Sequence, residues 1–346
     1  MLKLEENLLR NIINSILIND EKNLTINLDD TMQYNLEMPA DSAAVELAYL
    51  YLLARPVESE SLLASIVEGK PKIGNLRENI LKSQEYRDNI LRLLAIDYYV
   101  SKQSELLSKV NRTNSINSDN RITILQTCDD KRYPVLLEAA KPFNQAYANK
   151  WKLDYSSYLG IKRGKHPHHA MLNRIYLLDE YINSGYTGWV LYLDSDSIIS
   201  DLNYDIVNKL SSLRYNNQCL WLHNVYLEDD RRFEWFHIND GAFAIDLGSP
   251  IAQLVVRTWK GIYDNFYSEK DFENATNWLD IIDDQSSLSK ILEIFELRNY
   301  VCLEQLQHFF AYQALRQDHQ GISSDDELKL RAESIHKKGE EIYHIS

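Results

Sequence analysis

The chain has 346 residues, of which 45% are hydrophobic and 25% are charged, and this ordinary balance excludes a largely disordered or collagen-like protein. Its length allows about two domains. With 51 Asp and Glu residues against 37 Lys and Arg residues, the formal net charge is −14. Such a surface repels phosphate backbones, so non-specific nucleic-acid binding is not expected. An anionic ligand would need a metal ion or a few local cations.

The sequence carries no sign of secretion or membrane insertion. Glu5, Glu6 and Arg10 interrupt the apolar positions near residue 1, so no secretory signal is predicted, and no apolar stretch is long enough for a transmembrane helix. The cysteines stand far apart and form no CxxC pair. A reducing compartment is therefore expected, and the predicted localisation is cytoplasmic.

The first 110 residues predict a helical module. Apolar residues recur at the helical period, and plausible stops separate the segments. The expected helices span residues 1–18, 43–54, 59–67, 73–82 and 83–107. A polar run over residues 111–120 contains almost no large apolar side chain and is predicted to be a linker. The expected organisation is a helical module over 1–110, the linker 111–120 and a second domain over 121–346.

From residue 121 onward, short β-branched or apolar runs alternate with helical segments. The strands are expected at residues 121–127, 153–157, 189–193, 219–223 and 241–245. The helices between them are expected at residues 134–147 and 169–183. This alternation predicts an α/β domain with a mostly parallel sheet flanked by helices.

The strongest candidate for chemistry is an acidic pair that follows an apolar strand. Asp194 and Asp196 stand two residues apart after WVLYL. Ligands collect at the carboxyl ends of strands in open α/β sheets, and paired carboxylates suit Mn²⁺ or Mg²⁺. Such a cation can neutralise a departing diphosphate. The structural alternative is that Asp194 caps the next turn and Asp196 is only solvated.

Three further segments carry polar side chains of interest. In SIHKKG, His336 is a candidate metal ligand and Lys338 a candidate phosphate contact, although the charges around them predict an exposed, mobile tail. Asn239, Asp240 and Gly241 predict a turn before a short strand. The residues Asp283, Asp284 and Gln285 either cap the helix that follows or face a sugar pocket.

A run of histidines at residues 166–169 is not expected to bind zinc. Zinc needs three or four ligands, and no cysteine or further histidine stands at a supporting spacing. An exposed loop or the rim of a substrate site is the expected role.

The order of these segments resembles that in nucleotide-sugar glycosyltransferases of the GT-A fold. A first strand, a helix bearing Arg174, the DSD pair, an N-x-G segment, a D-D-Q segment and a late H-x-x-G follow one another over residues 121–346. The match is nearest to the retaining group that includes yeast α-galactosyl- and α-mannosyltransferases and plant xyloglucan xylosyltransferases. The HFAGC-like ending of that group is absent here.

This resemblance implies a role for each matching residue. Asp194 would bind ribose or a water on the metal, Asp196 would ligate the metal directly, and His336 would be the third protein ligand. Lys338 would contact the diphosphate and Arg174 the donor. The nucleoside would be held by Thr127, Cys128, Asp129 and Tyr133. The donor sugar would be surrounded by Asn239, Asp240, Gly241, Asp284 and Gln285.

The implied activity is that of a metal-dependent hexosyl- or pentosyltransferase. It would move a sugar, with retention, from a UDP-linked or other nucleoside-diphosphate donor to a glycan, protein or other acceptor. Asp240, Asp284 and Gln285 are the expected catalytic residues, with Asp246 as a further candidate nucleophile. Two alternatives remain open: a metal-dependent phosphoesterase using the same carboxylates, and a non-catalytic sugar-nucleotide-binding or interaction protein.

The N-terminal half has a resemblance of its own. AYLYLLARPVESESL followed by ILKSQEYRD is similar to a small helical domain of unknown function in bacterial surface and glycan-related proteins. The similarity covers residues 43–95. It implies a bacterial source and an interaction module that binds a protein partner.

Overall fold

The computed structural model describes most of the second half of the chain and parts of the first. The described residues are 39–42, 45, 60–72, 75–76, 79–80, 84–110, 119–224, 235–277, 280–305, 311–314 and 324–343. The helix expected at residues 1–18, most of that at 43–54, and residues 111–118 of the expected linker lie outside them. The chain divides into two compact units, Met1–Arg92 and Leu93–Ser346.

The described part of the first unit is helical, as the sequence predicts. It contains α3 (Glu60–Glu68) and the beginning of α5 (Gln84–Ser104). A single antiparallel bridge joins Pro39 to Lys72.

The division between the units falls within α5 rather than at the polar run expected to be the linker. Beyond Arg92, Ile96 and Val100 are fully buried in the apolar core of the second unit. Because these apolar residues pack in that core, the end of α5 belongs to the second unit. The short 3₁₀ helix Glu105–Ser108 that follows it belongs there as well.

The second unit is built on a six-stranded sheet with the order β2-β1-β3-β6-β5-β7. β1 pairs in parallel with both β2 and β3, and β5 pairs in parallel with β7, whereas β6 runs antiparallel to β3 and β5. A small antiparallel sheet joins β4 to β8. The strands are β1 (Ile122–Cys128), β2 (Asp154–Leu159), β3 (Trp189–Asp194), β4 (Ser197–Ile199), β5 (Leu220–Asn224), β6 (Ile238–Asp246), β7 (Val301–Gln305) and β8 (Ala311–Gln313).

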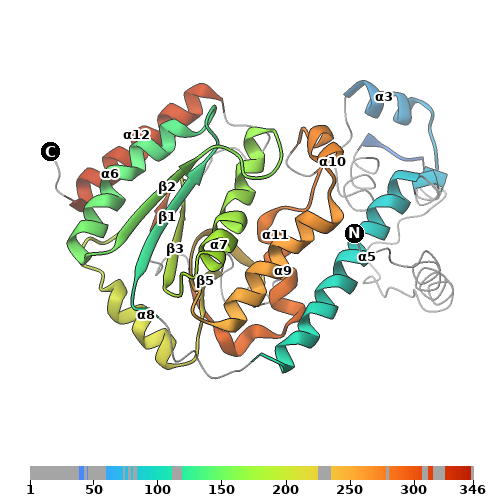
Figure 1. Ribbon diagram of the computed structural model, residues 1–346. Coiled ribbons are helices and arrows are strands. Elements are labelled where there is room, and N and C mark those ends of the chain that lie inside the picture. Colours follow the sequence, from blue (N-terminus) through green and yellow to red (C-terminus); the bar gives the residue numbers. More distant parts are fainter. Residues whose placement is uncertain are drawn as a thin grey trace. The chain divides into compact units, whose positions relative to one another are not determined.

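Helices cover both faces of this sheet, so the second unit has three layers (Figure 1). One face packs against α6 (Pro134–Trp151), α8 (Ile206–Tyr215) and α12 (Asp325–Tyr343). The other packs against α7 (Asn173–Asn183), α9 (Pro250–Phe266) and α11 (Asp284–Ile294), with α10 (Glu269–Asn274) after α9. Alternate residues of β3 enter the two cores, with Leu191 and Leu193 on the first face and Val190 and Tyr192 on the second.

The predicted α/β class and the mostly parallel sheet flanked by helices are confirmed. Two local expectations are wrong. Asn239, Asp240 and Gly241 lie inside β6 rather than in a turn before it, because the pairing with β5 extends back to Ile238. The region around His336 is part of α12 rather than a mobile tail, because Ile335, Gly339 and Tyr343 form a buried face of that helix.

Within the described residues, no helix is long and apolar enough to cross a membrane.

Candidate functional site

Three strand ends meet at one edge of the large sheet. The parallel register places Thr127 at the end of β1 opposite Asp194 at the end of β3. The antiparallel register brings the beginning of β6 to the same edge, with Ala242 opposite Leu193. A Cβ atom on Gly241 would lie 2.8 Å from both Asp194 Oδ2 and Gln313 Nε2, so any side chain here would displace the ends of these two side chains. The edge expected to carry ligands therefore gathers side chains from β1, β3 and β6.

A buried arginine stands at the centre of this edge. Arg174 projects from α7, and its guanidinium contacts three carboxylates: Nη2 lies 2.7 Å from Asp194 Oδ1, Nη1 3.0 Å from Asp240 Oδ1 and Nε 3.0 Å from Asp284 Oδ2. Its Cζ atom lies 4.4 Å from the centre of the Tyr192 ring. The resemblance implies that Arg174 contacts the donor, and this stays a prediction; its side chain is only 5% exposed and forms ion pairs with three carboxylates.

Negative charge exceeds positive charge in this cluster. Burial raises the pKa of Asp194 to about 7 and that of Asp240 to about 6, although the charge of Arg174 opposes both shifts. Burial, together with the neighbouring Asp240, raises the pKa of Asp284 well above its usual range. Three carboxyl groups share one guanidinium, so this site favours an additional cation or proton.

Asp196 is held in a different way from Asp194. One of its oxygens, Oδ2, forms a buried ion pair with Arg331 of α12, whose Nε donates to the carbonyl oxygen of Ala314 at 2.9 Å. The other oxygen, Oδ1, accepts a hydrogen bond from Gln313 Nε2 at 3.2 Å. The same Nε2 donates to Asp194 Oδ2, also at 3.2 Å. Gln313 thus bridges the two carboxylates of the DSD pair.

The turn that presents the DSD pair is fixed by two buried amides. Gln126 Nε2 donates to the carbonyl oxygens of Asp194 and Ser197 at 3.0 and 3.2 Å. Asn144 of α6 donates to Ser197 O at 2.9 Å and accepts from the backbone N–H of Ile199 at 3.0 Å. These bonds hold the backbone between β3 and β4, so the positions of both carboxylates are preorganised.

A pocket of about 250 Å³ opens over these groups. Its lining is polar, and four aspartates contribute to it against one arginine. The residues around it are Arg174, Asp194, Asn239, Asp240, Gly241, Asp283, Asp284, Gln285 and Gln313. Every residue that the resemblance assigns to the donor sugar is among them. The structure therefore brings together the donor-sugar set and Asp194, with Asp196 adjoining through Gln313.

The donor set in this pocket suits a hard divalent cation. Asp194 Oδ2 and Asp196 Oδ1 both approach the amide of Gln313. The nitrogen and oxygen of a glutamine amide are assigned only from hydrogen bonding. A 180° flip of the Gln313 amide would place Oε1, instead of Nε2, next to the two carboxylate oxygens. Two carboxylate oxygens and one amide oxygen are ligands that Mn²⁺ and Mg²⁺ accept. Among the described residues, no three His, Cys, Asp or Glu side chains form such a group by themselves.

Two expected ligands lie on the surface of α12. The His336 side chain is 62% exposed, stands 3.6 Å from Glu340 Oε1 and faces the Phe143 ring at 5.7 Å. Lys338 is paired with Glu341 at 3.3 Å. Neither lines the pocket. The structure does not bring His336 to Asp194 and Asp196, and Arg331 is the α12 residue that reaches this pair.

The residues expected to hold the nucleoside lie at the end of β1 and in the turn after it, and several already form hydrogen bonds within the protein. The Asp129 carboxylate accepts backbone hydrogen bonds from Lys131, Arg132 and Tyr133 at 2.7, 2.6 and 3.1 Å, and so fixes the turn into α6. Thr127 shares a hydrogen bond of 3.1 Å with the Tyr192 hydroxyl. Burial raises the pKa of the Cys128 thiol to about 12, so this thiol stays neutral.

The histidine run is structural in part. His169 is fully buried, and its Nδ1 accepts hydrogen bonds from the backbone N–H groups of Lys165 and His166 at 3.0 and 3.2 Å. His168 is only 4% exposed. The expected exposed loop is therefore wrong for these two residues, which form part of the packed turn before α7.

Sequence reasoning missed three residues of the site: Gln313, Arg331 and Tyr192. Gln313 reaches the DSD pair only because β8 pairs with β4, which places it opposite Ser197. No local pattern marks that pairing. Arg331 stands four residues before Ile335 on the buried face of α12, and this helical spacing was the available signal.

Comparison with known proteins gives no family assignment. No family model matches the chain, and no curated protein matches its sequence. One similar solved structure is a glycosyltransferase involved in the glycosylation of the major capsid of PBCV-1, with 12% identity, a TM-score of 0.42, and coverage of 63% of this chain and 99% of that one.

Two other solved structures are similar over shorter or weaker alignments. A protein named as a glucose-1-phosphate thymidylyltransferase from Bacillus anthracis, in complex with sucrose, has 9% identity, a TM-score of 0.35, and coverage of 62% of this chain and 95% of that one. A197 from STIV has 13% identity, a TM-score of 0.25, and coverage of 36% of this chain and 64% of that one. At these scores the likeness decides nothing about activity, which has to be argued from the site.

Proposed function

We propose that the second unit is a metal-dependent glycosyltransferase of the GT-A type that uses a nucleoside-diphosphate sugar, with UDP as the expected nucleotide. The observation that carries the proposal is the convergence of Asp194 Oδ2 and Asp196 Oδ1 on one point, each 3.2 Å from Gln313 Nε2. An acidic pocket at a sheet edge holds a diphosphate only through a cation.

The proposed cation is Mn²⁺ or Mg²⁺, held by Asp194, Asp196 and Gln313. When bound, it supplies positive charge that neutralises the diphosphate. Arg331 binds the second oxygen of Asp196 and so fixes which oxygen faces the pocket. His336 remains the third ligand that the resemblance implies, and the variants below separate it from Gln313.

The remaining pocket residues are proposed to bind the donor sugar. Asn239 and Gln285 supply amide groups for its hydroxyls, while Asp240 and Asp284 lie beside Arg174 in the same pocket. Arg174 is itself only 5% exposed and pairs with Asp194, Asp240 and Asp284, so its proposed role is to orient these carboxylates as a positioning residue. Retention of configuration rests on the resemblance alone, as do the nucleoside roles of Thr127, Cys128, Asp129 and Tyr133 and the diphosphate role of Lys338.

The test measures metal and nucleotide binding before any turnover. Manganese binding is followed by electron paramagnetic resonance, and UDP binding by calorimetry with and without Mn²⁺. Asp196→Asn keeps the shape of the side chain and should weaken Mn²⁺-dependent UDP binding by at least about 100-fold, close to the cost of removing one electrostatic group from such a site. Asp201→Ala, at an exposed carboxylate after β4, is the matched control and should bind as the unsubstituted protein does.

Unsubstituted protein that binds UDP equally well with and without Mn²⁺ would contradict the metal dependence. Protein that binds neither UDP nor any UDP-sugar, while remaining folded by circular dichroism, would contradict the proposed function as a whole.

A further inference from the structure

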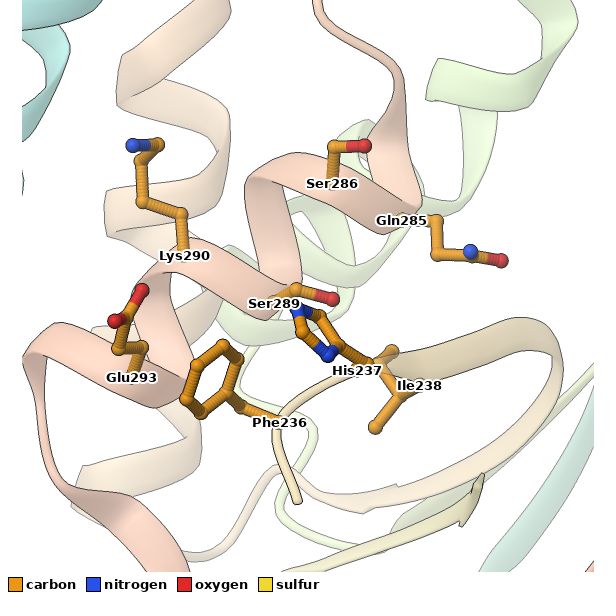
Figure 2. A pocket seen from close by; sticks show the side chains of 8 residues that line it. All are labelled: Phe236, His237, Ile238, Gln285, Ser286, Ser289, Lys290 and Glu293. Atoms are coloured by element: carbon orange, nitrogen blue, oxygen red, sulfur yellow. The ribbon is translucent and has the colours of Figure 1, made fainter. Parts of the chain in front are cut away.

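A second pocket has a volume of about 310 Å³, and Figure 2 shows the side chains that line it. This pocket and the acidic pocket share Gln285, and both are walled by the beginnings of the same two elements. On β6 and the residue before it, His237 and Ile238 line the second pocket, while Asn239 and Asp240 line the first. The molecule therefore holds two neighbouring binding sites that meet at Gln285.

The chemistry of the second pocket differs from that of the first. Figure 2 shows the Phe236 ring and the His237 imidazole on one side, facing α11 on the other. The aromatic side is a connected corner, because the Phe236 ring lies 5.8 Å from Trp235 and 4.8 Å from His237. An apolar ring face is thus available opposite a polar helix.

The helical side offers hydrogen-bonding groups of several kinds. Ser286, Ser289, Lys290 and Glu293 follow one another along α11 at spacings of one or three residues. Lys290 lines the pocket, and its ammonium group is paired with Asp97 of α5. Ser286 Oγ donates to Asp283 Oδ2 at 2.9 Å and is left as an acceptor, Ser289 can both donate and accept, and the Glu293 carboxylate accepts from the hydroxyls of a ligand.

We infer that this second pocket is the acceptor site, and that the acceptor is a saccharide. A sugar ring has an apolar face of C–H groups and a rim of hydroxyls, which match the aromatic corner and the α11 side chains respectively. Pockets that bind small ligands combine such apolar walls with a few convergent polar groups. The inference rests on the proposed function, which assigns the donor to the acidic pocket.

Transfer of the sugar requires donor and acceptor to lie side by side, and the two pockets meet at Gln285. An acceptor hydroxyl must come within about 3–3.5 Å of the donor's anomeric carbon. Its oxygen then forms the new bond to that carbon while the bond from the carbon to the diphosphate oxygen breaks. The hydroxyl proton passes to the departing diphosphate, so the reaction needs no further reactant.

The experiment uses the full chain and three probes: methyl β-galactopyranoside, methyl α-glucopyranoside and methyl α-mannopyranoside. Binding is measured by saturation-transfer NMR. At least one glycoside should bind with a dissociation constant in the millimolar range. Ser286→Phe fills the pocket from an exposed position on α11 and should weaken that binding at least tenfold. Ser211→Phe, at an exposed serine of α8, is the matched control and should leave glycoside binding unchanged.

A second variant, Glu293→Ala, removes an exposed carboxylate from the pocket and should weaken glycoside binding as well. Binding of none of the three glycosides, or binding that persists unchanged in both pocket variants, would overturn the acceptor site. The calorimetric titration with UDP and Mn²⁺ tests the proposed function separately. Glycoside binding without UDP binding would contradict that function and leave the pocket as a saccharide site.

Discussion

The two ends of the β3–β6 pair each carry an arginine, but the charges around them differ. At one end Arg214 forms a two-pronged pair with Asp246, with Nε 2.7 Å from Asp246 Oδ2 and Nη2 2.8 Å from Asp246 Oδ1. At the other end Arg174 faces three carboxylates. The first end is balanced and lies over Trp189, whereas the second has excess negative charge and opens into a pocket.

The balance of charge around each arginine distinguishes a structural ion pair from an arginine in a candidate binding site. A matched bidentate pair satisfies both partners and leaves nothing for a ligand to contribute. A cluster with surplus carboxylates is costly to bury and is stabilised when a cation enters. The sequence offered Asp246 as a candidate nucleophile beside Asp240 and Asp284. The structure corrects this, because Asp246 lies opposite Trp189 at the far end of β6 and is occupied by Arg214.

The largest effect is expected from Arg174→Met. Removing the guanidinium leaves the buried Asp240 and Asp284 and the half-buried Asp194 without their counter-charge, which should cost about 3–5 kcal/mol of unfolding free energy at pH 8. The cost should shrink toward pH 5, because Asp194 and Asp240 have raised pKa values of about 7 and about 6 and then take up protons. Urea unfolding at the two pH values measures the difference.

Arg214→Met is the matched control for this prediction. It strips the counter-charge from the carboxylate of Asp246 rather than from a cluster of three, so its cost should change less between pH 8 and pH 5 than the cost of Arg174→Met does. An equal pH dependence for the two variants would contradict the contrast between the balanced end and the acidic end.

The next effect separates stability from binding. Asp246→Asn leaves Arg214 buried beside an uncharged partner and should cost about 3 kcal/mol, with Mn²⁺-dependent UDP binding unchanged. Asp240→Asn removes one of several like charges near Arg174 and should be close to neutral for stability. It should nevertheless lower sugar transfer by about 100-fold. The reverse pattern, with Asp240→Asn destabilising and Asp246→Asn inactive but stable, would exchange the assigned roles.

The parts of the site that local sequence patterns could predict are those carried by one element. An apolar strand followed by two acids is a continuous signal, so Asp194 and Asp196 were found and placed at the correct sheet edge. Capping is one of the two open alternatives for Asp283, and its Oδ1 accepts from the backbone N–H of Ser286 at 2.6 Å while the residue also lines the acidic pocket. Asn239 and Asp240 were selected, although inside β6 rather than in a turn.

The parts that failed depend on contacts between distant elements. Gln313 enters the site through strand pairing across more than a hundred residues, and nothing near it in the sequence marks that role. For α12 the sequence does contain a signal for a packed helix, but the many charges around His336 favour the prediction of an exposed tail. Gly339 is the clearest part of it, because a Cβ atom there would lie 2.3 Å from the Phe143 ring, and only glycine allows so close an approach of helix to ring.

A smaller effect concerns a buried histidine beside the acidic end. His223 of β5 pairs in register with Asn239, and burial lowers its pKa to about 4. It therefore contributes stability above its unfolded pKa of about 6.5, and this is lost as the pH falls through about 4. The loss should reach about 3 kcal/mol. The carboxyl groups with raised pKa values change the unfolding free energy in the opposite direction over the same pH range. The pH dependence of the unsubstituted protein alone therefore does not reveal the contribution of His223.

His223→Gln isolates the histidine, because Asp194 and Asp240 titrate in both proteins and cancel in the difference. Between pH 7.5 and pH 4, the unsubstituted protein should lose more unfolding free energy than the variant does. Guanidinium unfolding of both proteins at the two pH values provides the comparison. Equal losses would show that His223 is protonated in the folded protein, against the lowered pKa.

The smallest effects decide which side chain completes the metal site. Gln313→Ala should weaken Mn²⁺ binding about 10- to 100-fold, because its amide bridges Asp194 and Asp196 from a fixed strand. His336→Ala removes a side chain that is 62% exposed and should change Mn²⁺ affinity less than about twofold. Electron paramagnetic resonance titration with Mn²⁺, alone and with UDP, measures both affinities.

A large loss of Mn²⁺ affinity in His336→Ala that depends on UDP would instead mean that α12 rearranges around bound donor. The histidine would then reach the metal, as the family resemblance implies. Equal, small losses in both variants would leave the two carboxylates as the whole protein contribution and remove the bridging amide from the site.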